Sequence, residues 1–313
     1  MSADAPPTTT AAGTGAPAPT PAPATGRAVG PGPLRRLFNE LTRSASGFAG
    51  LCLVVAILLL SLIGPLVVGT DVPGDASRAW EGPSADHWLG LEGSGKDTLH
   101  LLVIGGRTVL MVGFLAAGIT TVIAVAVGSL AGYFGGRFDA AMLQLTDIVM
   151  TVPQIVLLAV IGAFYNLDSP MLLGIIIGIL SWPVLMRSIR AQVLSLKERE
   201  FVEAAQLLDV GWVRIVFGEI VPNMASYILI NFIIAVTNAI YAMVGLYLLG
   251  LAPQKGTNWG IMINDAWTKG AMFNPDAMPY IVAPVTMIVL LQLGLILLTR
   301  TLEEILNPRL RDR

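Results

Sequence analysis

The chain has 313 residues, of which 54% are hydrophobic and only 13% are charged, and its formal net charge is −2. Soluble domains carry about 25% charged residues, so this composition excludes an ordinary soluble enzyme and indicates a membrane protein. The near-neutral charge offers nucleic acid no general attraction. One cysteine and two histidines exclude an internal disulfide and argue against a histidine-rich metal site.

The first 33 residues differ in kind from the rest of the chain. Ala, Pro, Thr and Gly account for 28 of them, a composition that cannot bury a core and predicts a disordered tail. We expect residues 34–105 to hold an amphipathic segment, a first membrane helix and an external loop. The apolar run of that helix is about 23 residues long with no small-x-small site after it, which favours a retained anchor over a cleaved signal peptide.

Long uncharged stretches rich in Leu, Ile, Val and Ala fill most of the remaining chain. A membrane span takes about 20 helical residues, and these stretches lack the period-two alternation of a barrel strand. The pattern predicts an all-α polytopic membrane protein with six transmembrane helices, near residues 48–69, 108–131, 141–164, 171–193, 222–249 and 280–301. Residues 106–301 would form a core with five of these helices, and residues 302–313 a C-terminal tail.

The positively charged residues set the expected orientation. With both termini in the cytoplasm, 14 of the 19 Lys and Arg residues lie on the cytoplasmic side. The five left outside are Arg78, Lys96, Arg107, Lys255 and Lys269. Because positive charges gather on the inner side of membrane proteins, both termini are expected inside.

Residues 90–97 of the external loop come close to the phosphate-loop pattern GxxxxGK[ST]. The final position needs a hydroxyl for Mg²⁺, and here it is Asp97, whose carboxylate would repel phosphate. No apolar strand precedes the segment. We therefore interpret it as an ordered, glycine-rich turn and expect no nucleotide site in it.

Within the predicted spans, glycine pairs and one acidic residue stand out. Gly128–Gly132, Gly132–Gly136 and Gly174–Gly178 have the small-xxx-small spacing that lets helices approach closely, and we expect contacts within the chain. Asp147 is the most interior charge of the third span. An ion relay is one interpretation; the other is that Asp147 reaches interfacial water or Arg137.

The longest internal cytoplasmic segment, residues 195–219, holds the densest charge cluster. A helix is predicted over residues 197–208, with Phe201, Ala204, Ala205 and Leu208 on one face. The two alanines keep that face shallow, and a rim of charged residues from Lys197 to Glu203 surrounds it. Such a helix suits a groove in a partner protein.

The Glu203-Ala204-Ala205 triplet, followed by Ile220 and Pro222, resembles the EAA loop of ATP-binding-cassette (ABC) importer permeases. Further stretches, in order along the chain, resemble the dipeptide/oligopeptide/nickel subfamily: residues 86–90, 95–97, 131–136, 192–205, 245–251, 258–260 and 307–310. The short outer loop after the first helix resembles the C-type member of a two-permease pair. The resemblance implies the type I importer permease fold in the bacterial inner membrane.

In that family the loop docks on a cytoplasmic ATPase, so the resemblance implies that residues 197–211 couple ATP hydrolysis to transport. It implies a charge contact for Glu203, close packing for Ala204 and Ala205, a turn shaped by Asp209 and Gly211, and roles for Ile220 and Pro222 before the fifth helix. The family has glycine where this chain has Asp209. That residue ends the helix in a left-handed conformation, which Asp tolerates better than most residues.

The resemblance also implies the partners. They are a homologous second permease, two ATPases that carry the ATP and Mg²⁺, and an extracytoplasmic substrate-binding protein. The chain itself would be a non-catalytic half of the pore with no cofactor and no metal. Peptides are the expected substrate, with oligosaccharides or nickel chelates as alternatives in the same subfamily. An ion-coupled secondary transporter is the more distant alternative.

Overall fold

The computed structural model describes residues 41–164, 169–252 and 254–306. The predicted disordered tail, most of the amphipathic segment before Leu41, and residues 307–313 lie outside the described residues. Within the described residues the secondary structure is helical apart from one isolated antiparallel bridge between Leu91 and Asp97. The prediction of an all-α membrane protein is confirmed.

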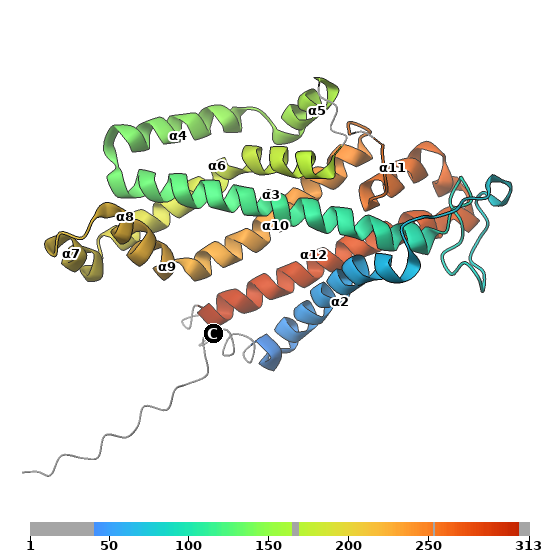
Figure 1. The fold of residues 1–313 in the computed structure, drawn as a ribbon, viewed down its shortest axis with the longest axis horizontal. Helices are drawn as coiled ribbons and strands as arrows, with labels where there is room; N and C mark the ends of the chain where they lie inside the picture. The colour runs from blue at the N-terminus through green and yellow to red at the C-terminus, as the bar shows by residue number, and fades with distance from the viewer. Residues whose placement is uncertain (1–40, 165–168, 253, 307–313) are drawn as a thin grey trace, which may run out of the picture.

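Five helices are long and apolar enough to cross a membrane: α2 (Ala45–Val68), α3 (Thr98–Phe134), α6 (Pro170–Lys197), α10 (Ala225–Leu248) and α12 (Met278–Leu306). They run roughly along the long axis of the molecule, with the short helices α7 to α9 at one end and α11 toward the other (Figure 1). We call these the α7 end and the α11 end. Ser46 near the start of α2 lies 3.5 Å from Thr301 near the end of α12, so these two helix ends are neighbours.

The third predicted span is two helices rather than one. α4 (Gly136–Thr151) and α5 (Gln154–Phe164) meet at an angle of 73°. The break falls at Pro153, which has no N–H for the helical ladder and disfavours a helical residue before it. Val152 is accordingly extended, with φ −96° and ψ 122°. The prolines within α2, α6 and α12, by contrast, lie inside helices that continue past them.

The second span begins ten residues earlier than predicted, at Thr98 rather than 108. Asp97 caps this end of α3, because its carboxylate accepts a hydrogen bond of 2.8 Å from the His100 amide and another of 2.8 Å from Nδ1 of His87. Arg107, taken as the outer boundary, lies inside the helix. At about 1.5 Å per residue, the 37 residues of α3 reach well beyond a hydrocarbon core of about 30 Å.

α3 and α6 pack closely along their length because glycines on each helix face the other. A Cβ atom on Gly128 would lie 2.7 Å from the Met186 carbonyl oxygen, and one on Gly178 would lie 2.9 Å from that of Ala116. Thr120 Oγ1 donates a 3.1 Å hydrogen bond to the Gly178 carbonyl across this contact. The expectation of contacts within the chain holds for Gly128, Gly132, Gly174 and Gly178. It is wrong for Gly136, where a Cβ would meet open space and φ is +59°.

The remaining helices surround this pair. α2 packs on α12 and α3, and α10 packs on α3, α6 and α12. At the α11 end, Trp259 of α11 (Trp259–Thr268) is fully buried and donates a 2.8 Å hydrogen bond to the Leu102 carbonyl of α3. A large core therefore fills the middle and the α11 end, and a second, smaller core lies under α7.

Candidate functional site

The predicted coupling helix is α7 (Glu200–Leu207), a separate helix that follows α6 after a two-residue break. It stands with α8 (Trp212–Arg214) and α9 (Val221–Asn223) at one end of the molecule, past the ends of α3 and α6 (Figure 1). The prediction of one helix over 197–208 is corrected at its start, because Lys197 closes α6 and the chain turns before Glu200.

Three residues of the predicted apolar face of α7 point away from the rest of the chain, whereas the fourth, Ala205, packs against the chain's own smaller core. Leu208 is 79% exposed, Phe201 is 37% exposed and Ala204 is exposed, whereas Ala205 is half-buried. Leu207, which the sequence pattern did not assign to this face, is 82% exposed. Large apolar side chains exposed on a short helix are the arrangement expected of a surface that another protein covers.

The opposite side of α7 is anchored by one fully buried residue, Val202. It joins a core in which Ile215 and Ile220, from the segment after α7, pack with Met186, Ile189 and Val193 of α6 and Ala131 of α3. Ile220, a predicted site residue, is thus a buried anchor. The helix is fixed to the ends of two membrane helices while its apolar face stays open.

Lys197 contributes to this attachment rather than to a charged rim. Its Nζ donates a 2.6 Å hydrogen bond to the Tyr133 carbonyl, one of the last carbonyls of α3, and lies 5.6 Å from the centre of the Tyr133 ring. Carbonyls at a helix end have no partner within the helix and attract cations. The expectation that Lys197 lines the α7 rim is therefore wrong; Glu203 and Glu200 are exposed there.

Asp209 ends the coupling helix in the left-handed region, with φ 55°. The Val210 amide bonds the Ala205 carbonyl at 3.1 Å and the Asp209 amide bonds the Gln206 carbonyl at 3.0 Å, the two bonds of a Schellman turn. Gly211 is not left-handed: it has φ −57° and ψ 144° and precedes α8. The special backbone conformation therefore falls on Asp209 alone.

After α8, the chain reaches α10 through a wide helical turn and α9. Residues Ile215–Ile220 form a π-helical turn, η2, and Pro222 lies in the first turn of α9, where its missing N–H costs nothing. Pro222 is exposed, and α10 itself begins only at Ala225. The predicted start of the fifth span at 222 is thus a separate short helix.

An aromatic row ties this region to α3. Phe134 packs edge-on against Trp212 of α8 at 5.2 Å between ring centres, and against Tyr133 at 5.4 Å. Edge-to-face pairs at such distances contribute about 0.5–1.5 kcal/mol beyond their burial. The segment from α7 to η2 therefore contacts α3 as well as α6.

The two acidic residues of α4 pair with α6. Asp139 forms an ion pair with Arg190, and Asp147 forms one with Arg187, which also donates to Thr146 Oγ1 at 2.9 Å. The predicted partner Arg137 is wrong for Asp147. A charge in a membrane helix is stabilised by such a partner, so both pairs hold α4 against α6.

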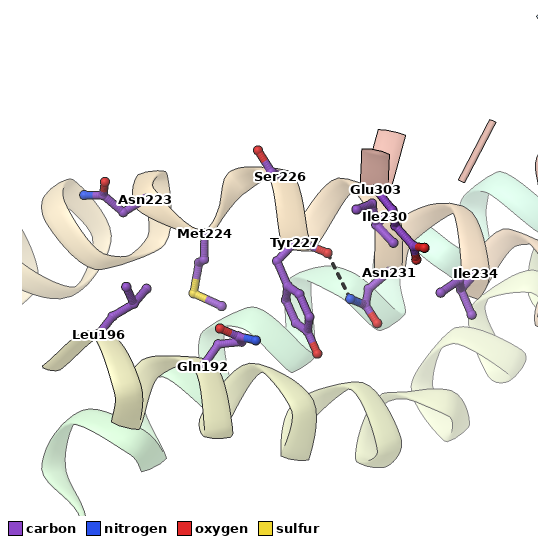
Figure 2. Close-up of a pocket in the computed structure, with 10 residues that line it drawn as sticks. All are labelled: Gln192, Leu196, Asn223, Met224, Ser226, Tyr227, Ile230, Asn231, Ile234 and Glu303. Carbon is purple, nitrogen blue, oxygen red and sulfur yellow. Dashed lines mark hydrogen bonds between the residues drawn. The ribbon is translucent and has the colours of Figure 1, made fainter. Parts of the chain in front are cut away.

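A groove of about 570 Å³ opens between α6 and α10 near the α7 end, and α12 contributes Glu303 to it. Figure 2 shows Tyr227 and Asn231 of α10 on the side that faces Gln192 of α6. Asn231 Nδ2 donates a 2.9 Å hydrogen bond to the Tyr227 carbonyl. These uncharged polar residues do not stand out in the sequence, because each alone is ordinary in a membrane helix.

These sites offer apolar surface and hydrogen-bonding side chains. Within the described parts of the chain, no three His, Cys, Asp or Glu side chains are grouped to hold a metal ion. The segment that resembles a phosphate loop lies before α3, away from α7, and its Asp97 is engaged by His87 and by the first turn of α3. The glycine-rich turn has φ +71° at both Gly90 and Gly95, and the Gly95 amide donates a 2.8 Å hydrogen bond to the Glu92 carbonyl.

Comparison with known proteins gives consistent matches over most of the chain. Residues 124–312, which include α7, match the family described as binding-protein-dependent transport system inner membrane component. The dipeptide transport system permease protein DppC of Alkalihalophilus pseudofirmus is 29% identical over 282 residues, covering 90% of this chain and 91% of that protein. The oligopeptide transport system permease protein OppC of Mycobacterium tuberculosis is 30% identical over 282 residues, covering 89% and 94%.

Proposed function

Because the chain belongs to the family of inner membrane components of binding-protein-dependent transport systems, we propose that it is a permease subunit of an ATP-driven importer of di- or oligopeptides. The similarity to permeases named for dipeptide and oligopeptide transport, over nine-tenths of the chain, supports peptides rather than oligosaccharides or nickel chelates. The chain is a multi-pass membrane protein. In this proposal it forms half of the pore and catalyses no reaction itself.

The proposed partners are a homologous second permease, two ATPases and an external substrate-binding protein. The loop 197–211 would receive an ATPase, which holds the ATP and Mg²⁺, so that this chain needs no cofactor. The observation that supports this docking most directly is the exposed apolar face of α7 on a helix anchored by Val202. The α7 end would face the cytoplasm, in agreement with the 14 positive charges expected on that side.

The geometry supplies a physical route for coupling. Closure of the ATPases would displace α7, and the buried Val202 and Ile220 together with the Lys197 bond would carry the displacement into α6 and α3. The bundle would then alternate between inward-facing and outward-facing states, each favoured by different contacts with the ATPases. Glu203, exposed beside the apolar face, would contact charge on the ATPase.

Uptake of labelled trialanine by cells that carry the complete transporter tests the function. Uptake should require ATP and survive collapse of the proton gradient. Uptake that instead follows the proton gradient and survives ATP depletion would identify a secondary transporter. Absence of trialanine uptake, with uptake of an oligosaccharide or a nickel chelate, would contradict the peptide substrate.

A charge placed on the apolar face tests the docking. Ala204→Arg should abolish co-purification of the ATPase and reduce uptake at least about tenfold, since burying an unpaired charge costs several kcal/mol. Gln206→Arg is the matched control, because Gln206 is an exposed residue of the same helix outside the apolar face. Equal ATPase recovery with both variants would rule out this face as the docking surface.

A further inference from the structure

One face of α10 combines exposure with polar side chains. Tyr227, Asn231, Asn238 and Tyr241, which we call the α10 polar row, follow one another at spacings of four, seven and three residues and so share one side of the helix. Asn238 and Tyr241 are exposed and the other two are half-buried; Ile234, on the same side between the two asparagines, is also exposed. The row extends from the groove of Figure 2 along most of the span.

Contact with lipid hydrocarbon is unfavourable for the side chains of the α10 polar row. Hydrocarbon offers no partner to an amide or a hydroxyl, and each such group costs free energy when it faces lipid unpaired. The exposed large residues of α2, and those of α12 before Arg300, are apolar, among them Leu59, Leu62, Ile63, Val282, Val285 and Val289. These faces suit lipid, whereas the polar row suits water or a polar partner.

The row also carries no charge. The 35 residues between Glu219 and Lys255 include no Asp, Glu, Lys or Arg. Across the groove, Gln192 of α6 adds another uncharged amide, and the one charged side chain that lines the groove is Glu303 of α12, at the end of the row nearest α7. Asn and Gln present both donors and an acceptor, which are the groups that match the N–H and C=O of a peptide main chain.

The spacing of the row fits an extended peptide. Asn231 and Asn238 are seven residues apart in one helix, a rise of about 10 Å. Three residues of an extended chain span nearly the same length, at about 3.4 Å each. Main-chain groups of one cargo molecule can therefore meet both amides at once.

We propose that the α10 polar row lines the translocation path and binds the main-chain amides of an extended peptide, without regard to the charge of its side chains. This rests on the proposed function only in naming the cargo as a peptide. The alternative occupant of the row is a helix of the second permease, since Asn side chains also bond across helix interfaces. The following two experiments distinguish these occupants.

The first experiment measures access from water in the assembled transporter. In a Cys52→Ser background, Asn231→Cys and Asn238→Cys should react with a charged, water-soluble thiosulfonate reagent. Leu229→Cys, exposed on another side of α10, should not. If the two row positions react no faster than Leu229→Cys, the row is covered by protein or lipid and the proposal is wrong. This result does not depend on what is transported.

The second experiment measures charge preference. Wild-type transporter and Asn238→Asp are compared for uptake of Ala-Lys-Ala and Ala-Glu-Ala, with the same binding protein present. The Asp variant should shift the ratio toward the lysine peptide by about 30-fold, because one unit charge at about 4 Å in water favours the lysine peptide about fivefold and disfavours the glutamate peptide by a similar factor. Because a ratio cancels differences in assembly, an unchanged ratio would overturn the proposal. Absence of uptake of either peptide by the wild type would instead contradict the proposed function, while the labelling result would still decide whether the row faces the path.

Discussion

At the residue scale, Asp209 is notable because it is a non-glycine residue in the left-handed region, with φ 55°. A non-glycine residue in the left-handed region experiences a close approach between its Cβ and the following carbonyl, which costs roughly 1–2 kcal/mol and least for Asn and Asp. The turn nonetheless sets where α7 ends, because both of its terminal bonds depend on this conformation. The left-handed conformation of Asp209 therefore costs some backbone strain and ends α7 at this point.

This strain predicts opposite effects for two substitutions. Asp209→Gly should preserve or slightly raise thermal stability of the transporter, because glycine adopts φ 55° at no steric cost. Asp209→Val should lower the free energy of unfolding by about 1–2 kcal/mol relative to glycine. Thermal unfolding of the purified complex in detergent measures both. Equal midpoints for Gly and Val would contradict a left-handed residue 209.

Two further residues show what a sequence can and cannot reveal at this scale. The left-handed turn at Asp209 was predictable because helix ends have a local pattern, and the backbone confirms it. The partners of Lys197 and Asp147 were not, because they lie 64 and 40 residues away in the chain. A charged residue in a membrane helix indicates that a partner is needed, but the sequence does not show which neighbouring helix supplies that partner.

At the scale of elements, the contact between α3 and α6 is the most extensive in the bundle. It depends on glycine because backbone carbonyls of one helix stand where a Cβ of the other would be. Carbonyl oxygens of a helix cannot move aside as a flexible side chain can. The two helices should therefore move together during transport, as one rigid body.

A pair of alanine substitutions in α3 tests this contact. Gly128→Ala should destabilise the protein by about 1–3 kcal/mol, since its Cβ would lie 2.7 Å from the Met186 carbonyl oxygen. Gly118→Ala should be neutral or stabilising, because a Cβ there meets nothing within 4 Å and alanine favours helix. Thermal midpoints of the two variants measure the difference. A Gly128→Ala variant as stable as Gly118→Ala would show that the helices are not in close contact.

The spans themselves were predicted well by the positions of uncharged residues, yet their ends and one bend were not. Hydropathy reports which residues face hydrocarbon, whereas a helix ends where its capping groups stop it. Asp97 therefore starts α3 ten residues before the apolar run suggested. Likewise Pro153 was visible in the sequence, but the angle of 73° depends on how α4 and α5 pack, α4 against α3 and α6 and α5 against α6 and α10.

At the scale of the whole molecule, the two hydrophobic cores stabilise different parts of the structure. The large core holds the bundle together through the middle and the α11 end, and the small core fastens the α7 region to α3 and α6. The family and its general function followed from the sequence, because the coupling loop is a local pattern. The α10 polar row was not predictable from the sequence, because the sequence of a span does not say which of its polar residues are exposed.

The short link between α6 and α7 has a further consequence. Only Glu198 and Arg199 separate the two helices, so the direction in which the apolar face of α7 points is set by the length of this link. One residue inserted there would turn the face by about 100° if α6 simply continued, or would pull Val202 out of its core. Such an insertion should abolish uptake in either case, and the thermal midpoint should fall only if Val202 leaves its core. The orientation of α7 relative to α6 would thus be set by the number of residues between the two helices. A substitution at Glu198 or Arg199 should therefore reduce uptake far less than an insertion or deletion there.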